Sequence, residues 1–231
     1  MVIYYRMKLL LEVGGDKIPY KELVKVGLIG DFGNVFMPGS LGSDLFRIYI
    51  LQRYLRNVTR AASAVIYERF IGLVSLAFIV FVSVIWARKI LMEIGVYGLL
   101  CSLCIVLAMI LFAFFIFPNT ILTVFNSVFR MKNRIGHKIR LIAETIMDYS
   151  LYKRLFFGVF AICIATQIMR ILVTFIVASA IGVSVDIQYF FLLVPIIIFV
   201  LMIPVSVGGL GVRGGVSVFL FSFVGVAQAD A

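Results

Sequence analysis

Long apolar stretches separated by short polar ones dominate the pattern along this chain of 231 residues. Four stretches are apolar nearly throughout, and about 20 such residues suffice to cross a bilayer as a helix. We therefore expect membrane-spanning helices at residues 61–87, 94–117, 155–181 and 189–205. Two further apolar segments, about 23–45 and 204–227, are interrupted by Pro and Gly.

Residues 119–154 follow a different pattern, because apolar residues recur at helical spacing while basic residues fill the positions between them. The series Ile135, Ile139, Ile142 and Ile146 is an example. This pattern favours two amphipathic helices lying in the membrane interface over an ordinary solvated loop. Residues 45–60 show a similar alternation and predict a further amphipathic helix.

The first interrupted segment contains Pro38, Gly39 and Gly42, with Asn34 before the break. Proline removes a backbone donor and glycine favours turns, so we expect no continuous helix through it. Asp44 and Arg47 follow the break directly. Ionisable residues beside a broken apolar segment are typical of a substrate or ion site in a membrane protein.

The second interrupted segment repeats this outline, with a Gly four residues and an Arg nine residues after its Pro. The matching residues are Pro204, Gly208 and Arg213, and Gly209 and Gly211 lie between the last two. Corresponding broken segments in two halves of a chain point to a transporter binding site. Coincidence is the alternative, and the agreement of Pro, Ser, Gly and Arg within ten positions favours a repeat.

Composition places the chain in the membrane class, since it is 63% hydrophobic and only 14% charged. Soluble domains carry about 25% charged residues. The predicted fold is an all-α, polytopic membrane helical bundle. The net charge of +10 comes from basic residues between the spans, which favours contact with anionic lipid headgroups over nucleic acid binding.

The distribution of basic residues also predicts the orientation. Residues 118–154 hold seven Lys and Arg and are expected in the cytoplasm, whereas residues 182–188 hold none and are expected outside. Both flanks of the first broken segment are basic, so we expect residues 23–45 to enter the membrane and return on the same side. The apolar pieces at both ends are short, which predicts one membrane domain over residues 1–231, truncated at both ends.

The sequence predicts no metal site, cofactor or catalytic residue. Cys101 and Cys104 have CxxC spacing but lie within a predicted span without a second ligand pair, and the single histidine, His137, lies in a basic segment. Small-residue packing explains the cysteines better than redox or metal chemistry.

Together, these motifs resemble the flippase-like integral membrane family, also described as the transmembrane region of lysylphosphatidylglycerol synthases. The family pattern has an Asn, a Pro, a Gly-rich turn with Asp, and an Arg, followed by an acidic–basic pair and a final Gly-Gly-Leu-Gly-Val-Arg signature. In this chain the corresponding residues are Asn34, Pro38, Gly39, Gly42, Asp44, Arg47, Glu68, Arg69, Gly72 and Gly208 to Arg213. Two positions depart from the pattern: Ser43 replaces a second Gly, and Gly214 replaces an acidic residue.

The resemblance implies a membrane protein that translocates a polar lipid, either aminoacylated phosphatidylglycerol or a lipid-linked precursor, in the cell membrane. Some members carry a soluble domain that transfers an amino acid to the lipid, and no such domain lies in these residues. The alternative is a membrane subunit or recruiting partner of a lipid-modifying transferase, such as a lysylphosphatidylglycerol synthase or a glycosyltransferase.

Within that function, Arg47 and Arg213 are our candidates for binding a phosphate, because a guanidinium offers a planar fork of donors and stays charged. For Arg47 a cytoplasmic anchoring role is the alternative. Asp44 is expected either to bind a cationic headgroup or to cap a helix beginning at Leu45. Asn34 is expected to donate side-chain hydrogen bonds to backbone groups freed by the break.

Three more charged residues lie in predicted spans, where an unpaired charge is costly. Glu68 and Arg69 are adjacent and diverge by about 100° on a helix, so we expect one of them to face Arg47, Asp44 or Arg170. Arg170 needs a carboxylate, and Glu68 is the first candidate.

Overall fold

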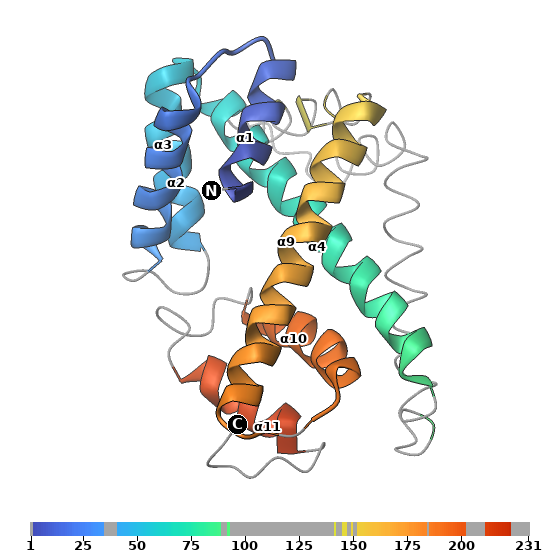
Figure 1. Cartoon of the computed structure of the whole chain (residues 1–231). Coiled ribbons are helices and arrows are strands. Elements are labelled where there is room, and N and C mark those ends of the chain that lie inside the picture. The colour runs from blue at the N-terminus through green and yellow to red at the C-terminus, as the bar shows by residue number, and fades with distance from the viewer. Residues whose placement is uncertain are drawn as a thin grey trace, which may run out of the picture.

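A computed structural model of the chain describes residues 2–34, 41–88, 92, 141, 145–146, 149, 152–183, 185–201 and 211–222. Within these ranges the protein is all-helical, which confirms the predicted fold class (Figure 1). The helices are α1 (Val2–Val13), α2 (Tyr20–Gly33), α3 (Leu41–Leu55), α4 (Val58–Trp86), α9 (Lys153–Ala180), α10 (Ile187–Leu201) and α11 (Val212–Ser222).

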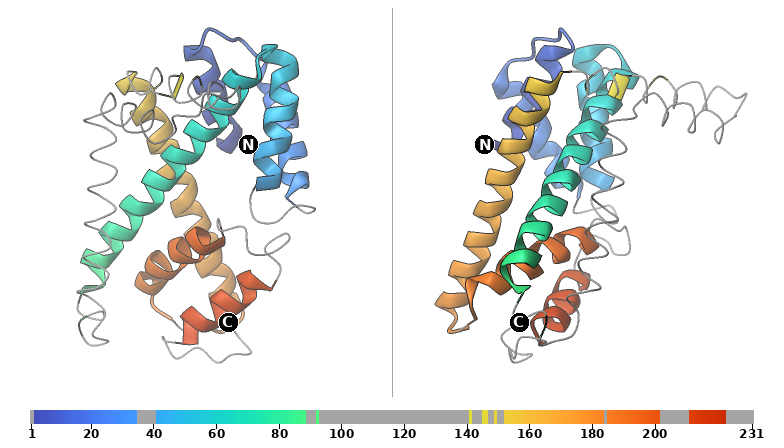
Figure 2. Two further views of the ribbon diagram at one scale, coloured as in Figure 1. Left: turned by 180° about the vertical axis from the view of Figure 1, so that it is seen from behind. Right: turned by 90° about the vertical axis from the view of Figure 1, so that its right-hand side faces the viewer.

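Helices α4 and α9 are long and apolar enough to cross a membrane. Both begin at the end of the molecule where α2 begins and α3 ends, so they run in the same direction (Figures 1 and 2). Asn57 begins α4, since its side-chain oxygen accepts hydrogen bonds from the backbone N–H groups of Thr59 and Arg60 at 2.9 and 3.2 Å. The bounds of α4 and α9 lie within three residues of the expected spans 61–87 and 155–181.

The structure differs from the predicted boundaries in two regions. The helix predicted at 45–60 begins earlier, at Leu41, and ends at Leu55, because Arg56 turns the chain with φ of 50° and Asn57 starts a new helix. Asp44 therefore lies in the first turn of α3 and does not cap a helix at Leu45. Lys153, predicted in the interfacial segment, is the first residue of α9.

Helices α2 and α3 pack against each other as a hairpin on one side of α1 (Figure 1). Glycine spacing explains their close approach, because Gly27, Gly30 and Gly33 form one buried stripe along α2. A Cβ atom at Gly33 would lie 2.5 Å from Cδ2 of Phe46. At Gly27 it would clash with the ring of Tyr4 on α1. The stripe therefore lets α2 contact both α1 and α3 closely.

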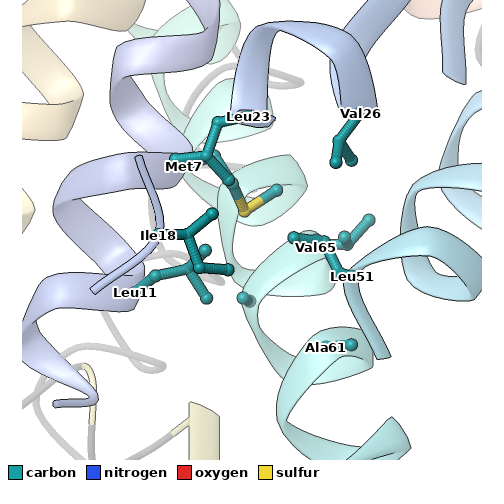
Figure 3. Close-up of a cluster of buried hydrophobic side chains, with 9 residues drawn as sticks. Met7, Leu11, Ile18, Leu23, Val26, Leu51, Ala61 and Val65 are labelled. Atoms are coloured by element: carbon teal, nitrogen blue, oxygen red, sulfur yellow. The ribbon is translucent and has the colours of Figure 1, made fainter. Parts of the chain in front are cut away.

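A buried apolar cluster joins the hairpin to α1 and α4 (Figure 3). Its members are Met7, Leu11, Ile18, Leu23, Val26, Leu51, Ala61, Ala64 and Val65. Since these residues come from all four N-terminal helices, burial of their side chains fixes how the hairpin sits on the long helix α4.

Helices α10 and α11 lie toward the C-terminal end of α9 (Figures 1 and 2). Phe190 and Ile197 of α10 pack there with Ile171 of α9, Ile79 of α4 and Phe221 of α11. The expected span 94–117, most of the interfacial segment 119–154 and residues 202–210 lie outside the described residues.

Candidate functional site

A cavity of about 500 Å³ opens among α1, α2, α3, α4, α9 and α10. Its lining is unusually charged for the interior of an apolar bundle. Four of the lining residues are arginines: Arg6, Arg47, Arg69 and Arg170. Three are acids: Asp31, Asp44 and Glu68. Among the described lining residues, guanidinium groups therefore outnumber carboxylates by four to three.

Glu68 of α4 lies at the centre of this group and is 4% exposed. Its Oε1 pairs with Nη2 of Arg6 at 2.9 Å, and its Oε2 pairs with Nη1 of Arg47 at 3.4 Å. The side chains of Arg6 and Arg47 are only 15% and 11% exposed. Two cations thus share one carboxylate, so this buried triad carries a net charge of +1.

The neighbouring residue, Arg69, forms a second pair with Asp44 across α3 and α4, at 2.5 Å between Nε and Oδ2. Because Glu68 and Arg69 diverge around the helix, α4 contacts α3 through two ion pairs, one through each residue. Both residues of the acidic–basic pair thus contact the first broken motif, whereas the sequence led us to expect such a contact for one of them.

Asn34 follows the last turn of α2 and binds the start of α3. Its side-chain oxygen accepts a 2.8 Å hydrogen bond from the backbone N–H of Ser43. That N–H is one of the donors that a helix N-terminus leaves without an intrahelical acceptor. Asn34 therefore contacts freed backbone as predicted, but its side chain accepts the hydrogen bond, whereas the prediction had it donating one.

Asp31 is held differently from the other two acids. It accepts a 2.7 Å hydrogen bond from the hydroxyl of Tyr4 and a longer one, at 3.5 Å, from Ser43 Oγ. Within the described part of the chain it forms no ion pair, whereas Glu68 and Asp44 each do.

The wall opposite the hairpin comes from α9 and α10. Helix α9 contributes Thr166, Gln167 and Arg170, and the side-chain oxygen of Gln167 is buried without a hydrogen-bond partner among the described residues. Helix α10 contributes the apolar residues Ile197, Ile198 and Leu201. The cavity therefore has charged residues on α1, α2, α3, α4 and α9 and an apolar surface on α10.

Of the residues predicted from the sequence, the cavity brings together Asn34, Asp44, Arg47, Glu68, Arg69 and Arg170. Glu68 was predicted to pair with Arg170. The two carboxylate oxygens of Glu68 pair instead with Arg6 and Arg47. Gly42 lies in the first turn of α3, and its carbonyl oxygen lies near Gly33.

The second broken motif is described only in part. Pro38 and Gly39 of the first motif, together with Pro204, Gly208 and Gly209 of the second, lie outside the described residues. Gly211 has φ of 83° and precedes α11, so it makes the turn expected there. Arg213 is the second residue of α11, and its side chain lies outside the described part. Leu201, three residues before Pro204, lines the cavity.

Sequence reasoning did not select Arg6, Asp31 or Gln167 as site residues, although all three line the cavity. Arg6 lies within a short apolar run near the start of the chain, which is typical of a buried cation of a helix. Asp31 stands between Gly30 and Phe32, inside the apolar part of the broken segment. A charge inside an apolar run was the available signal for both.

The arrangement is suited to binding charged groups. No group of three or more His, Cys, Asp or Glu side chains suited to a metal occurs within the described residues. A surplus of arginine beside an apolar wall favours an anionic group attached to an apolar body.

Comparison with known proteins gives one family. A search of curated proteins and a search of solved structures each found no match. The family described as lysylphosphatidylglycerol synthase TM region matches residues 1–231, the whole chain, so this membrane protein belongs to that family.

Proposed function

We propose that this protein is a multi-pass protein of the cell membrane that translocates a polar phospholipid, such as aminoacylated phosphatidylglycerol or a lipid-linked precursor. The observation that carries the proposal is the buried Arg6–Glu68–Arg47 triad with its net charge of +1. An isolated buried charge is costly, so a surplus cation facing a cavity favours an anionic ligand. A phosphodiester is an anion that guanidinium groups bind well.

The shape and lining of the cavity also fit such a ligand. Its volume of about 500 Å³ lies in the usual range of about 300–1,000 Å³ for small-molecule sites. A headgroup would lie against the charged residues of α3 and α4, while Ile197, Ile198 and Leu201 offer an apolar surface to the acyl chains. The lining thus matches the two chemical parts of a phospholipid.

The direction of the helices supports the orientation that we propose. Helices α4 and α9 run in the same direction, which agrees with one predicted span, 94–117, between them. The ends at which both helices begin carry Arg53, Arg56, Arg60, Lys153 and Arg154. By the positive-inside rule this end, with the basic segment 118–154 that leads to it, is cytoplasmic.

The α2–α3 hairpin fits a re-entrant element that enters from this cytoplasmic end. Helix α2 has 14 residues and rises about 21 Å, roughly half of the 29-residue α4. Its chain ends lie at the basic end, where Glu22 pairs with Lys25. Farther along, Leu28, Ile29, Phe32 and Leu45 expose apolar side chains. In this arrangement Asn34, Asp44 and the triad residue Arg47 would lie at membrane depth.

Translocation in proteoliposomes tests the proposal. The complete protein would be reconstituted, and the movement of lysylphosphatidylglycerol and phosphatidylglycerol between leaflets measured. Arg47→Gln removes one triad cation, and Arg53→Gln removes an exposed arginine of the same helix that bonds to Tyr49 outside the cavity. We expect translocation above empty liposomes for wild type and Arg53→Gln, and its loss in Arg47→Gln.

The recruiting-partner function predicts a different result. Folded, monodisperse wild-type protein that moves neither lipid faster than empty liposomes would contradict translocation. Equal rates for Arg47→Gln and Arg53→Gln would remove the triad from the lipid path.

A further inference from the structure

The cavity contains one negative charge that its own arginines do not neutralise. Glu68 and Asp44 are held by guanidinium groups, whereas Asp31 is held by the hydroxyls of Tyr4 and Ser43. Asp31 is not buried, so a ligand in the cavity can reach its carboxylate. A free carboxylate so close to the site would repel a purely anionic headgroup.

A polar atom without a hydrogen-bond donor belongs to another residue of the same cavity lining. The side-chain oxygen of Gln167 on α9 is buried and has no hydrogen-bond partner among the described residues. Buried polar atoms are nearly always hydrogen-bonded, so a lining residue that leaves its amide oxygen unpaired gains a hydrogen bond by turning that oxygen toward a donor in the cavity. Gln167 and Asp31 come from different helices, α9 and α2, and are therefore independent observations.

We propose that Asp31 binds the ammonium group of an amine-bearing phospholipid and thereby selects such lipids over those without an amine. The proposal rests on the proposed function in taking the ligand to be a phospholipid. An ammonium has three N–H donors and no acceptor, so it complements both Asp31 and the oxygen of Gln167. The phosphate of the same headgroup complements the surplus charge of the Arg6–Glu68–Arg47 triad. A headgroup with one anionic and one cationic group then matches the two unbalanced charges of the cavity.

Substitution of Asp31 separates this role from a structural one. Asp31→Asn removes the charge but keeps an oxygen that can accept the hydrogen bond of Tyr4. Asp31→Glu keeps the charge. Asp186→Asn is the matched control, because Asp186 is exposed, lies before α10 and does not line the cavity.

The measurement is competitive binding to the complete protein in detergent micelles, with phosphatidylethanolamine and phosphatidylglycerol of the same acyl chains. We expect wild type and Asp186→Asn to prefer phosphatidylethanolamine. Asp31→Asn should reduce that preference about tenfold or more, the least expected for loss of a hydrogen bond to a charged group. Asp31→Glu should restore most of it. Gln167→Leu should reduce the preference in the same direction.

The outcome depends on the ratio of the affinity for phosphatidylethanolamine to the affinity for phosphatidylglycerol. A wild-type protein without a preference, or a ratio unchanged in Asp31→Asn, would overturn the proposal, even if both affinities fell together. Because the assay measures binding, the two proposals fail separately. A preference that depends on Asp31 without any translocation would contradict only the proposed function, and translocation with a ratio indifferent to Asp31 would contradict only this inference.

Discussion

Gly30 on α2 lies directly against Arg47 on α3: a Cβ atom at Gly30 would be 2.6 Å from Cγ of Arg47 and 3.1 Å from the carbonyl oxygen of Ser43. The first contact is with a side chain of the triad and the second is with backbone. Helix packing and site geometry are therefore set by the same glycine.

Gly30→Ala should destabilise the protein and displace Arg47. Overpacking costs about 1–3 kcal/mol, more than the roughly 1 kcal/mol that alanine gains over glycine within a helix. Thermal unfolding in detergent and lipid binding would measure the two effects. Gly158→Ala on α9 is the control, since a Cβ there meets nothing within 4 Å. A Gly30→Ala protein as stable as Gly158→Ala would show that α2 and α3 pack less closely than described.

Glu68→Gln should be among the most damaging single substitutions. It leaves the guanidinium groups of Arg6 and Arg47 without their carboxylate in a buried site, and loss of one partner from such a group costs about 3–5 kcal/mol. The unfolding midpoint in detergent is the measurement.

The matched substitution is Glu12→Gln on α1. Glu12 pairs with Lys8 at 3.6 Å, and its side chain is 45% exposed. Exposed pairs contribute at most about 1 kcal/mol, so a small effect is expected. Similar losses of stability for the two variants would argue against a buried triad.

Cysteine labelling tests the re-entrant hairpin. Lys17 precedes α2 and Arg56 follows α3, so Lys17→Cys and Arg56→Cys should react with an impermeant reagent from the same, cytoplasmic side. Asp186→Cys, before α10, should react from the other side. Labelling of positions 17 and 56 from opposite faces would mean that the segment crosses the bilayer.

The contacts that join the start of α2 to the end of α3 should contribute less stability in acid. Hydrogen bonds from Lys25 and then Tyr54 lower the pKa of Glu22 below its ordinary value. A carboxyl whose folded pKa is lowered contributes stability above its unfolded pKa, and that contribution is lost as pH falls through the folded pKa. Wild type should therefore lose stability in this acidic window relative to Glu22→Gln.

The stability that Tyr54 contributes should be lost at alkaline pH, the opposite direction from that of Glu22. The hydrogen bond to Glu22 raises the pKa of the Tyr54 hydroxyl. Its contribution is present below the ordinary tyrosine pKa of about 10 and is lost as pH rises through the folded value. Tyr54→Phe should abolish that alkaline loss. Unfolding midpoints of Tyr54→Phe and wild type that change in parallel at high pH would contradict the Glu22–Tyr54 hydrogen bond.

The sequence predicted the helical fold and much of the cavity lining for a clear physical reason. Apolar stretches of span length define α4 and α9, and the cost of charge in a span singles out Glu68, Arg69 and Arg170. Adjacent residues on a helix point in different directions, which is why Glu68 and Arg69 reach separate partners.

Partner choice could not be predicted, because it depends on which helices meet. Nothing local indicates that Arg6 lies against Glu68, 62 positions later, or that Cys163 accepts a hydrogen bond from the same guanidinium at 3.0 Å. Gly27, Gly30 and Gly33 have a spacing of three, a helical signal of one small-residue face. Only the packing of α1 and α3 reveals that Tyr4, Arg47 and Phe46 fill that face.

The Arg6–Glu68–Arg47 triad has a consequence for biosynthesis. Both cations precede the acid in the chain, so each has left the ribosome before Glu68 does. A charge at the centre of a span costs about 2.5–3.5 kcal/mol during insertion. Helix α4 can offset that cost at once by docking on α1 and α3, which have already been made. A circularly permuted chain beginning at α4 would instead present its acid to the insertion machinery alone, and we expect it to insert poorly although every contact of the finished fold is available to it.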